Sequence, residues 1–232
     1  MILARSALRD AIVSGDLKIQ DDHGNPFTGF KIRQLGSMMA PAPNSFHDLT
    51  APGIVVSEGC ELENPKALEP ASIDLHVGNH WLVPKTNARV APDGGCPQGY
   101  VYADSRKPVE YTESFSDEYM IPAHGFILAR TQECVHISDR LTAWIEGRSS
   151  FGRFGFFVQN AGWTDPGFQG SITLEIYNAL PYPALLVAGT PCCQLVVSEM
   201  IGDAEGGYQG SYQGQLGTKG SMLYKTVPGG VR

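Results

Sequence analysis

The sequence predicts an all-β domain on three observations. Its 232 residues include 27 Gly and 16 Pro, which favours many turns and short strands over long helices. Short apolar runs recur along the chain with turn residues between them. Within residues 172–177, apolar and polar side chains alternate with the period of two that is typical of a half-buried strand. With 42% hydrophobic residues and no repeat or low-complexity linker, residues 1–232 are expected to form a single domain.

The first predicted element is a short helix over residues 4–14. Its apolar side chains recur at the spacing of one helical face, at Ala4, Ala7, Leu8, Ala11 and Ile12. Gly15 is expected to end the helix, because glycine accepts the left-handed conformation that often follows a last turn. A strand is expected to start at Leu17.

Residues 21–70 are polar and interrupted by Gly and Pro, and we interpret them as an insertion of loops and short strands. Strand-like runs then recur at residues 73–83, 126–129, 141–145, 154–158, 172–177, 184–187 and 194–199. From Gly206 onward the chain is rich in Gly, Gln, Tyr and Ser. Because this part has little apolar surface to bury, residues 206–232 are predicted to be mobile until a ligand arrives.

A cluster of basic and hydroxyl side chains follows the run at 141–145. Arg148, Ser149 and Ser150 come where that strand is expected to end, and Arg153 follows on a glycine-containing loop. Two guanidinium groups beside two hydroxyls can hold phosphate oxygens, because each arginine offers a fork of donors. On these residues alone, an exposed basic turn with serine caps is an equally good interpretation.

Two acidic residues follow this cluster. Asp165 belongs to an Asp-Pro-Gly sequence, which is strong turn chemistry, since proline presets φ and glycine accepts a positive one. Glu175 lies on the polar face of the alternating strand, so it points into solvent or into a cavity. We expect the two carboxylates to lie on either side of one hairpin turn and to face one cleft. Acidic residues at turns and on wet strand faces are also common without any function.

Charge and apolar patterning narrow the possible partners. A net charge of -7 argues against a general nucleic-acid binder, so a polyanionic ligand would need local positive charge. The sequence has no run of about twenty apolar residues and no signal-peptide pattern, so no membrane association is expected. We expect a cytoplasmic protein, or one in the host cytoplasm if the source is viral.

Three motifs between residues 147 and 178 resemble the signature of the dCTP deaminases, members of the deoxyuridine triphosphatase (dUTPase) superfamily that include bifunctional dCTP deaminase/dUTPases. The motifs are Gly147-Arg148-Ser149-Ser150-Phe151-Gly152-Arg153, Ala161-Gly162-Trp163-Thr164-Asp165-Pro166-Gly167-Phe168 and Ile172-Thr173-Leu174-Glu175-Ile176-Tyr177-Asn178. Residues 70–79 resemble the early strand of the family, and residues 211–215 resemble its substrate-covering C-terminal segment. The resemblance implies a distorted, dUTPase-like jelly roll with a short N-terminal helix and loop insertions.

The resemblance also implies catalytic roles. Glu175 would act as general base and then acid in the hydrolytic deamination of cytosine. Ser149 and the carbonyl group of Ala161 would hold the attacking water, and Arg153 would tune the glutamate and stabilise charge. Asp165 matches the aspartate that, in bifunctional members, contacts the deoxyribose and orients the water that attacks the α-phosphate.

The remaining residues that the resemblance singles out would bind substrate. Those expected to hold the triphosphate are Arg148, Ser150 and Gln194. Those expected near the base and sugar are Gln159, Asn160 and Trp163, and the closing C-terminal residues are Tyr208, Tyr212 and Gln215. Mg²⁺ would be carried by the phosphate oxygens, without a protein metal site. Three subunits of a homotrimer would share three active sites at their interfaces.

Zinc is not expected. Five cysteines, at positions 60, 96, 134, 192 and 193, form no Cys-x-x-Cys motif, and their odd number favours reduced thiols. Zinc-dependent nucleotide deaminases need His-x-Glu and Pro-Cys-x-x-Cys, whereas this chain has only Pro191-Cys192-Cys193-Gln194. Cys192 and Cys193 are instead expected to pack in or beside a strand.

Several functions remain open at this point. The first is zinc-independent deamination of dCTP, or of a 5-substituted dCTP such as 5-methyl-dCTP, to the corresponding deoxyuridine or thymidine triphosphate. The second is a bifunctional reaction that gives dUMP and pyrophosphate. The others are a dUTPase without deaminase activity and a non-catalytic nucleotide-sensing protein. Gln159-Asn160-Ala161-Gly162 is one residue shorter than the family's His-x-Thr-Ala-Gly, which leaves inhibition by dTTP open and makes a 5-substituted base a candidate.

Overall fold

The computed structural model describes residues 1–21, 23–25, 32–34, 60–62, 67–85, 87–89, 98–100, 107–159, 162–202 and 204–229. At 32–34, 60–62, 87–89 and 98–100 it describes the backbone alone. Asn160, Ala161 and most of the predicted insertion over 21–70 lie outside the described residues. Within that insertion, β2 (Ile32–Gln34) pairs antiparallel with β3 (Cys60–Leu62).

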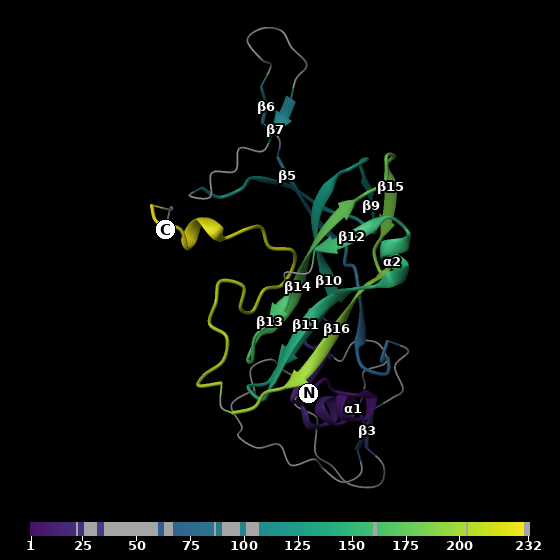
Figure 1. Cartoon of the computed structure of the whole chain (residues 1–232), viewed down its shortest axis with the longest axis vertical. Coiled ribbons are helices and arrows are strands. Elements are labelled where there is room, and N and C mark those ends of the chain that lie inside the picture. The colour runs from purple at the N-terminus through teal and green to yellow at the C-terminus, as the bar shows by residue number, and fades with distance from the viewer. Residues whose placement is uncertain are drawn as a thin grey trace.

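The N-terminal helix is confirmed as α1 (Arg5–Ser14; Figure 1). It buries Leu8, Ala11 and Ile12. It ends at Gly15, whose φ of 85° is the left-handed conformation that glycine adopts at low cost. The chain then enters β1 (Leu17–Gln20) as predicted.

The larger sheet has six antiparallel strands. Five of them follow the order β12 (Phe156–Gln159), β14 (Gln169–Asn178), β10 (Phe126–Ile137), β5 (His80–Pro84) and β8 (Tyr111–Phe115). The sixth strand, β1, also pairs with β10. The internal strand β14 pairs with β12 on one side and β10 on the other. The strand that carries the third motif, residues 172–178, therefore has neighbours on both edges, which hold its backbone in position.

The second sheet has four strands, in the order β13 (Trp163–Thr164), β11 (Leu141–Gly147), β16 (Pro191–Glu199) and β4 (Ile73–His76). Two further described pairs are β9 (Glu118–Ile121) with β15 (Ala184–Val187), and β6 (Asn87–Arg89) with β7 (Gln98–Tyr100). The short helix α2 (Ser149–Arg153) follows β11, and a 3₁₀ helix, η1 (Leu223–Lys225), lies near the C-terminus. The predicted all-β class is confirmed.

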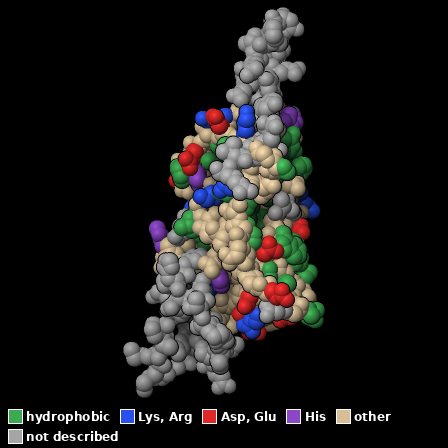
Figure 2. All heavy atoms as spheres, turned by 90° about the vertical axis from the view of Figure 1, so that its left-hand side faces the viewer, with side chains coloured by type: hydrophobic (Ala, Val, Ile, Leu, Met, Phe, Trp, Pro, Cys, Tyr) green, Lys and Arg blue, Asp and Glu red, His purple; other side chains and the backbone are tan. Residues whose placement is uncertain are grey.

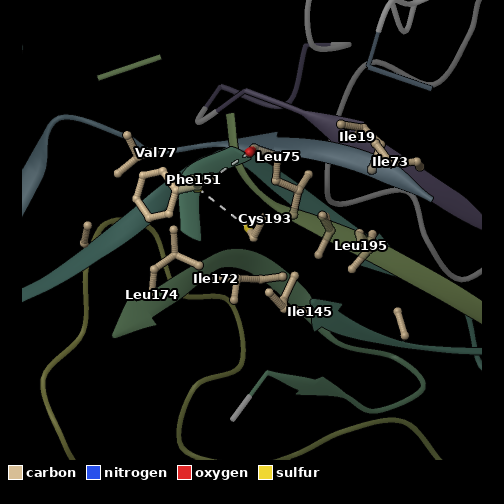
Figure 3. Close-up of a cluster of buried hydrophobic side chains, with 14 of the residues drawn as sticks. Ile19, Ile73, Leu75, Val77, Ile145, Phe151, Ile172, Leu174, Cys193 and Leu195 are labelled. Carbon is tan, nitrogen blue, oxygen red and sulfur yellow. Dashed lines mark hydrogen bonds between the residues drawn. The ribbon is translucent and has the colours of Figure 1, made fainter. Parts of the chain in front are cut away.

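The core lies where the inner faces of the two sheets meet (Figure 3). Ile172 and Leu174 of β14 are 7% and 1% exposed, and Cys193 and Leu195 of β16 are fully buried. Ile176 is also fully buried, so the predicted alternation along β14 is confirmed. The polar side chains of this strand therefore lie on its opposite face.

Three local predictions are wrong. The run at 73–83 is two strands in different sheets, because the chain turns at Gly78, whose N–H donates to the carbonyl oxygen of Arg130 at 2.7 Å. A Cβ atom at Gly78 would lie 3.0 Å from Arg130 Cγ, so this approach favours glycine. Residues 149–153 form α2 rather than a loop, and the following strand begins at Phe156 rather than Phe154.

The cysteine prediction is confirmed for the described residues. Cys134, Cys192 and Cys193 are buried thiols outside any disulfide, and the last two lie in β16 with their sulfur atoms 3.7 Å apart. The hydrogen bond with Cys193, together with burial, raises the pKa of the Cys192 thiol, which keeps it protonated. Cys60 and Cys96 lie outside the described side chains.

The surface carries both signs of charge. Acidic and basic side chains are interspersed over the face shown in Figure 2. Among the described helices, none is long and apolar enough to span a bilayer.

Candidate active site

The first polar cluster forms around Arg148, which lies between β11 and α2. Its Nη2 atom is 3.0 Å from Asp74 Oδ2, and its Nη1 donates to Ser150 Oγ at 3.0 Å. Gln194 of β16 donates through Nε2 to Asp74 Oδ1 at 3.0 Å. Asp74 therefore holds, through its two oxygens, two of the residues expected to bind a triphosphate.

Asp74 is a site residue that the sequence analysis missed. It lies in β4 between the fully buried Ile73 and Leu75 and is itself 5% exposed. A carboxylate inside a run of buried apolar residues needs a cation or several donors, because an unpaired buried charge is costly. This position in the run at 73–83 was the signal that could have identified it.

Glu175 defines the second polar group. It is half-buried on β14, opposite Gln159 of β12 and Leu128 of β10. Glu175 lines a small pocket of about 250 Å³, counting space open to solvent. The other lining residues are Ile145, Gln159, Gly162, Ile172, Thr173 and Leu174.

Gly162 allows the pocket wall to close. A Cβ atom at this position would lie 2.8 Å from Ile145 Cβ, so a larger residue would push the two segments apart. The carbonyl oxygen of Gly162 also accepts a hydrogen bond from the Ile145 N–H at 3.1 Å. The glycine of the Ala-Gly-Trp motif therefore joins the edge of the four-stranded sheet to the pocket beside Glu175.

Burial raises the pKa of Glu175, and it is the only cause of this shift. A nearby guanidinium group would act in the opposite direction, because a positive charge favours the ionised carboxylate. Arg153 lies in the last turn of α2 with its side chain exposed, and neither it nor Ser149 lines the pocket. Within one chain, the structure does not bring the expected water-holding serine and tuning arginine to Glu175.

Asp165 forms a third group, and the predicted hairpin around it is wrong. It lies between β13 and β14, but β13 pairs with β11 of one sheet and β14 with β10 and β12 of the other. The turn therefore crosses from one sheet to the other, and Asp165 does not line the Glu175 pocket.

Trp163 orders the Asp165 side chain. The indole Nε1 donates to Asp165 Oδ1 at 3.0 Å, and the indole ring stacks on Trp144 with centroids 6.0 Å apart. Tyr208 reaches the same turn from the C-terminal segment, residues 206–229. Its N–H donates to the carbonyl oxygen of Pro166 at 2.7 Å, and its ring lies 5.8 Å from that of Phe168.

The C-terminal segment lies along the outside of the sheets beside β13 and β14 (Figure 1). Gln215 is buried there, and its carbonyl oxygen accepts the Ser171 N–H at 2.9 Å, while its Oε1 finds no partner among the described residues. The Tyr212 hydroxyl accepts the Met222 N–H at 3.1 Å. The segment thus makes more contacts than its composition suggests, although its mobility stays a prediction.

Within the described part of the chain, no three His, Cys, Asp or Glu side chains come together as a metal site. Asp74 is engaged by Arg148 and Gln194. The polar groups near the expected triphosphate position are a guanidinium, a hydroxyl and an amide, and these suit phosphate oxygens rather than a cation. This donor set fits a Mg²⁺ ion that arrives on the phosphates.

Together, these observations describe a two-sheet β protein with a cluster of guanidinium, hydroxyl and amide side chains around Asp74 and a separate half-buried glutamate. Residues 46–200 match the family described as dCTP deaminase-like. This chain belongs to the dCTP deaminase-like family.

Curated relatives are similar over most of their length. "dCTP deaminase, dUMP-forming" of Persephonella marina is 40% identical over 162 residues, which cover 68% of this chain and 83% of that protein. The protein of the same name from Sulfurihydrogenibium sp. is 38% identical over 177 residues, covering 73% and 92%. The crystal structure of 2'-deoxycytidine 5'-triphosphate deaminase from Agrobacterium tumefaciens aligns with a TM-score of 0.45 at 18% identity, over 84% of this chain and about half (47%) of that chain.

Proposed function

We propose that this protein hydrolyses dCTP in two steps. In the first, water replaces the amino group at C4, giving dUTP and ammonia. In the second, another water attacks the α-phosphate, giving dUMP and pyrophosphate. Relatives at 38–40% identity that bear the name "dCTP deaminase, dUMP-forming" support this order of events, as does the presence of both Glu175 and Asp165.

The observation that best supports the proposal is that Glu175 is half-buried and lines a pocket. Deamination needs one group that first takes a proton from water and then gives protons to N3 and to the leaving amine. A carboxylate with a raised pKa suits both tasks, because it binds the proton more firmly than an exposed glutamate does. The pocket beside Glu175 is lined by Gln159 and Thr173, which can hydrogen-bond the polar edge of a base.

The attacking water would be held by Ser149 and the carbonyl group of Ala161, and Arg153 would stabilise developing charge. Because Ser149 and Arg153 do not line the pocket of their own chain, we infer that a neighbouring subunit supplies them. Asn160 and Trp163 would complete the base and sugar site beside Gln159.

The triphosphate would bind at Arg148, Ser150 and Gln194. Asp74 supports this assignment, since it holds the guanidinium and the amide in fixed orientations before substrate arrives. Mg²⁺, when bound with the nucleotide, supplies charge neutralisation on the phosphates. Tyr208, Tyr212 and Gln215 would close over the nucleotide and limit access of bulk water.

Asp165 would orient the water for the second hydrolysis. Its carboxylate is exposed and keeps one oxygen on the indole of Trp163, which leaves the other oxygen for a water or for the deoxyribose hydroxyl. Asp165 does not line the Glu175 pocket of its own chain, which agrees with two chemical steps carried out by two carboxylates.

A homotrimer would unite the separated groups. Large aromatic side chains lie next to one another on the outer face of the six-stranded sheet, since Tyr177 is opposite both Phe126 and Phe157. These three are 37%, 43% and 56% exposed, and such a row favours an interface. Light scattering should give three times the 25.1 kDa of one chain. A fully active monomer would contradict the shared site.

The proposed reaction is tested by following ammonia and phosphate products from dCTP, 5-methyl-dCTP and dUTP in the presence of Mg²⁺. We expect ammonia and dUMP from dCTP. Ammonia with dUTP as the end product would refute the second step alone, and pyrophosphate from dUTP without ammonia from dCTP would identify a dUTPase. Tight nucleotide binding without turnover would indicate a sensing protein. Faster turnover of 5-methyl-dCTP would identify a 5-substituted base as the substrate.

A further inference from the structure

The C-terminal segment is docked on the six-stranded sheet mainly through hydrogen bonds. Its large apolar residues Leu216 and Leu223 are 55% and 53% exposed, whereas Gln215 and Thr218 are buried. Tyr208 packs against the core near the start of the segment, whereas apolar burial contributes little around Gln215 and Thr218. The position of this later part depends on whether its buried polar groups find partners.

The imidazole of His80, on β5, is such a partner. The Thr218 N–H donates to His80 Nδ1 at 3.0 Å, and the Thr218 hydroxyl donates to the His80 carbonyl oxygen at 2.6 Å. A backbone N–H can only donate, so Nδ1 must carry a lone pair. The proton then lies on Nε2, which is 2.7 Å from Glu113 Oε1 of β8. The contacts thus select one neutral tautomer of His80.

The surroundings hold this ring in a single orientation. Phe115 stacks on His80 with centroids 4.2 Å apart and planes 13° from parallel. On the segment side, Gly217 has a φ of 86°, and a Cβ atom there would lie 2.9 Å from His80 Nδ1. Only glycine lets the backbone approach the ring this closely.

The contact between His80 and Thr218, which we call the anchor, lies next to the candidate active site. The next residue, Lys219, donates its N–H to Thr173 Oγ1 at 3.1 Å, and Thr173 lines the Glu175 pocket. Three residues before the anchor, Gln215 pairs with Ser171 on the same strand. Fixing Thr218 therefore fixes the part of the segment that contacts β14 at Ser171 and Thr173.

We propose that His80 is a positioning residue that anchors the C-terminal segment at Thr218 through the lone pair of Nδ1, and so sets the place of Gln215 and Tyr212 over the substrate. The docking does not depend on the reaction. Its effect on turnover rests on the proposed function.

Two substitutions separate the roles of the two ring nitrogens. In His80→Asn the amide oxygen can take the place of Nδ1 and accept the Thr218 N–H, whereas in His80→Gln the amide nitrogen can take the place of Nε2 and keep the contact with Glu113. Amide hydrogen exchange of the nucleotide-free protein should be at least about tenfold faster over residues 214–222 in His80→Gln. In His80→Asn it should stay within about threefold of wild type.

Exchange over β10 and β14 is the internal control for the fold and should not change. Equal exchange of the segment in the two variants would overturn the proposal. A second pair leaves β5 undisturbed and tests the companion bond from the Thr218 hydroxyl to the His80 carbonyl oxygen: Thr218→Val should speed exchange of the segment, and Thr218→Ser should not. Both variants keep the backbone N–H that donates to Nδ1, so unchanged exchange in Thr218→Val would refute only the contribution of the hydroxyl.

Kinetics then test the consequence for the reaction. In His80→Gln we expect the KM for dCTP to rise about tenfold, with His80→Asn close to wild type. An identical KM in both variants, despite different exchange, would refute the role in substrate closure and leave the docking intact. Absence of any turnover in the wild-type protein would refute the proposed function without altering the exchange result.

Discussion

Asp74 shows how one buried carboxylate can order several residues of a site. It accepts from Gln194 and pairs with Arg148, whose side chain remains 33% exposed. Neither interaction was foreseen, because the sequence contains no sign of which strand pairs with β4. The pairing of Asp74 with Gln194 follows from the register of β4 against β16, which only the folded chain defines.

Asp74→Asn should lower the free energy of unfolding by about 1–3 kcal/mol, because it leaves the Arg148 guanidinium without its charged acceptor. Urea unfolding monitored by fluorescence measures the change. Asp165→Asn is the matched control, since Asp165 is exposed and an amide oxygen can still accept from Trp163; its effect should stay within about 0.5 kcal/mol. Equal losses in the two variants would contradict the role of Asp74.

The buried side chain of His136 should make the stability of the fold depend on pH. It is buried on β10 opposite Lys18, and burial, with a smaller effect of the Lys18 charge, lowers its pKa to about 4 from an ordinary value of 6.5. The unfolded chain therefore takes up a proton below pH 6.5 that the folded chain resists until about pH 4, so stability falls across this window as the pH falls.

Melting temperatures at pH 7, 6 and 5 test this. Whatever His136→Gln costs at pH 7, the variant should lose less stability than wild type between pH 7 and pH 5, because it lacks the titrating group. His23→Gln, at an exposed position, should follow the wild-type curve. Parallel curves for wild type and His136→Gln would show that His136 does not contribute.

At the scale of elements, patterns within one strand or helix were predictable and relations between strands were not. The helix over α1 and the alternation along β14 follow from local periodicity, and both are confirmed. The split of residues 73–83 and the crossing between β13 and β14 depend on the packing of two sheets. Short-range patterns contain no information on which sheet a strand joins, so the predicted hairpin around Asp165 was wrong.

Leu174→Ala tests the importance of β14 for the core. Leu174 is 1% exposed between the two sheets, so the substitution should reduce the free energy of unfolding by about 2–5 kcal/mol. Leu185→Ala on β15 makes the same chemical change at a residue that is 42% exposed, and it should cost less than about 1 kcal/mol. The two values come from denaturant titration, and similar losses would contradict a core centred on β14.

At the scale of the whole molecule, the candidate site residues form three groups. One is the Arg148 cluster, one is the Glu175 pocket and one is the Asp165 turn with the C-terminal segment. Apart from Asp74, the resemblance singles out the residues of these groups, and it predicts that neighbouring subunits share them. A single sequence could not predict the His80 anchor, because His80 and Thr218 are 138 positions apart and neither belongs to a recognised motif.

The central claim is that Glu175 is the group that moves protons during deamination. The most direct measurement is ammonia release from dCTP by wild type, Glu175→Gln and Glu118→Gln, the last being the same change at an exposed position on β9. We predict equal rates for wild type and Glu118→Gln, and a rate at least about 100-fold lower for Glu175→Gln with its melting temperature retained. Ammonia release by Glu175→Gln at the wild-type rate would contradict the account.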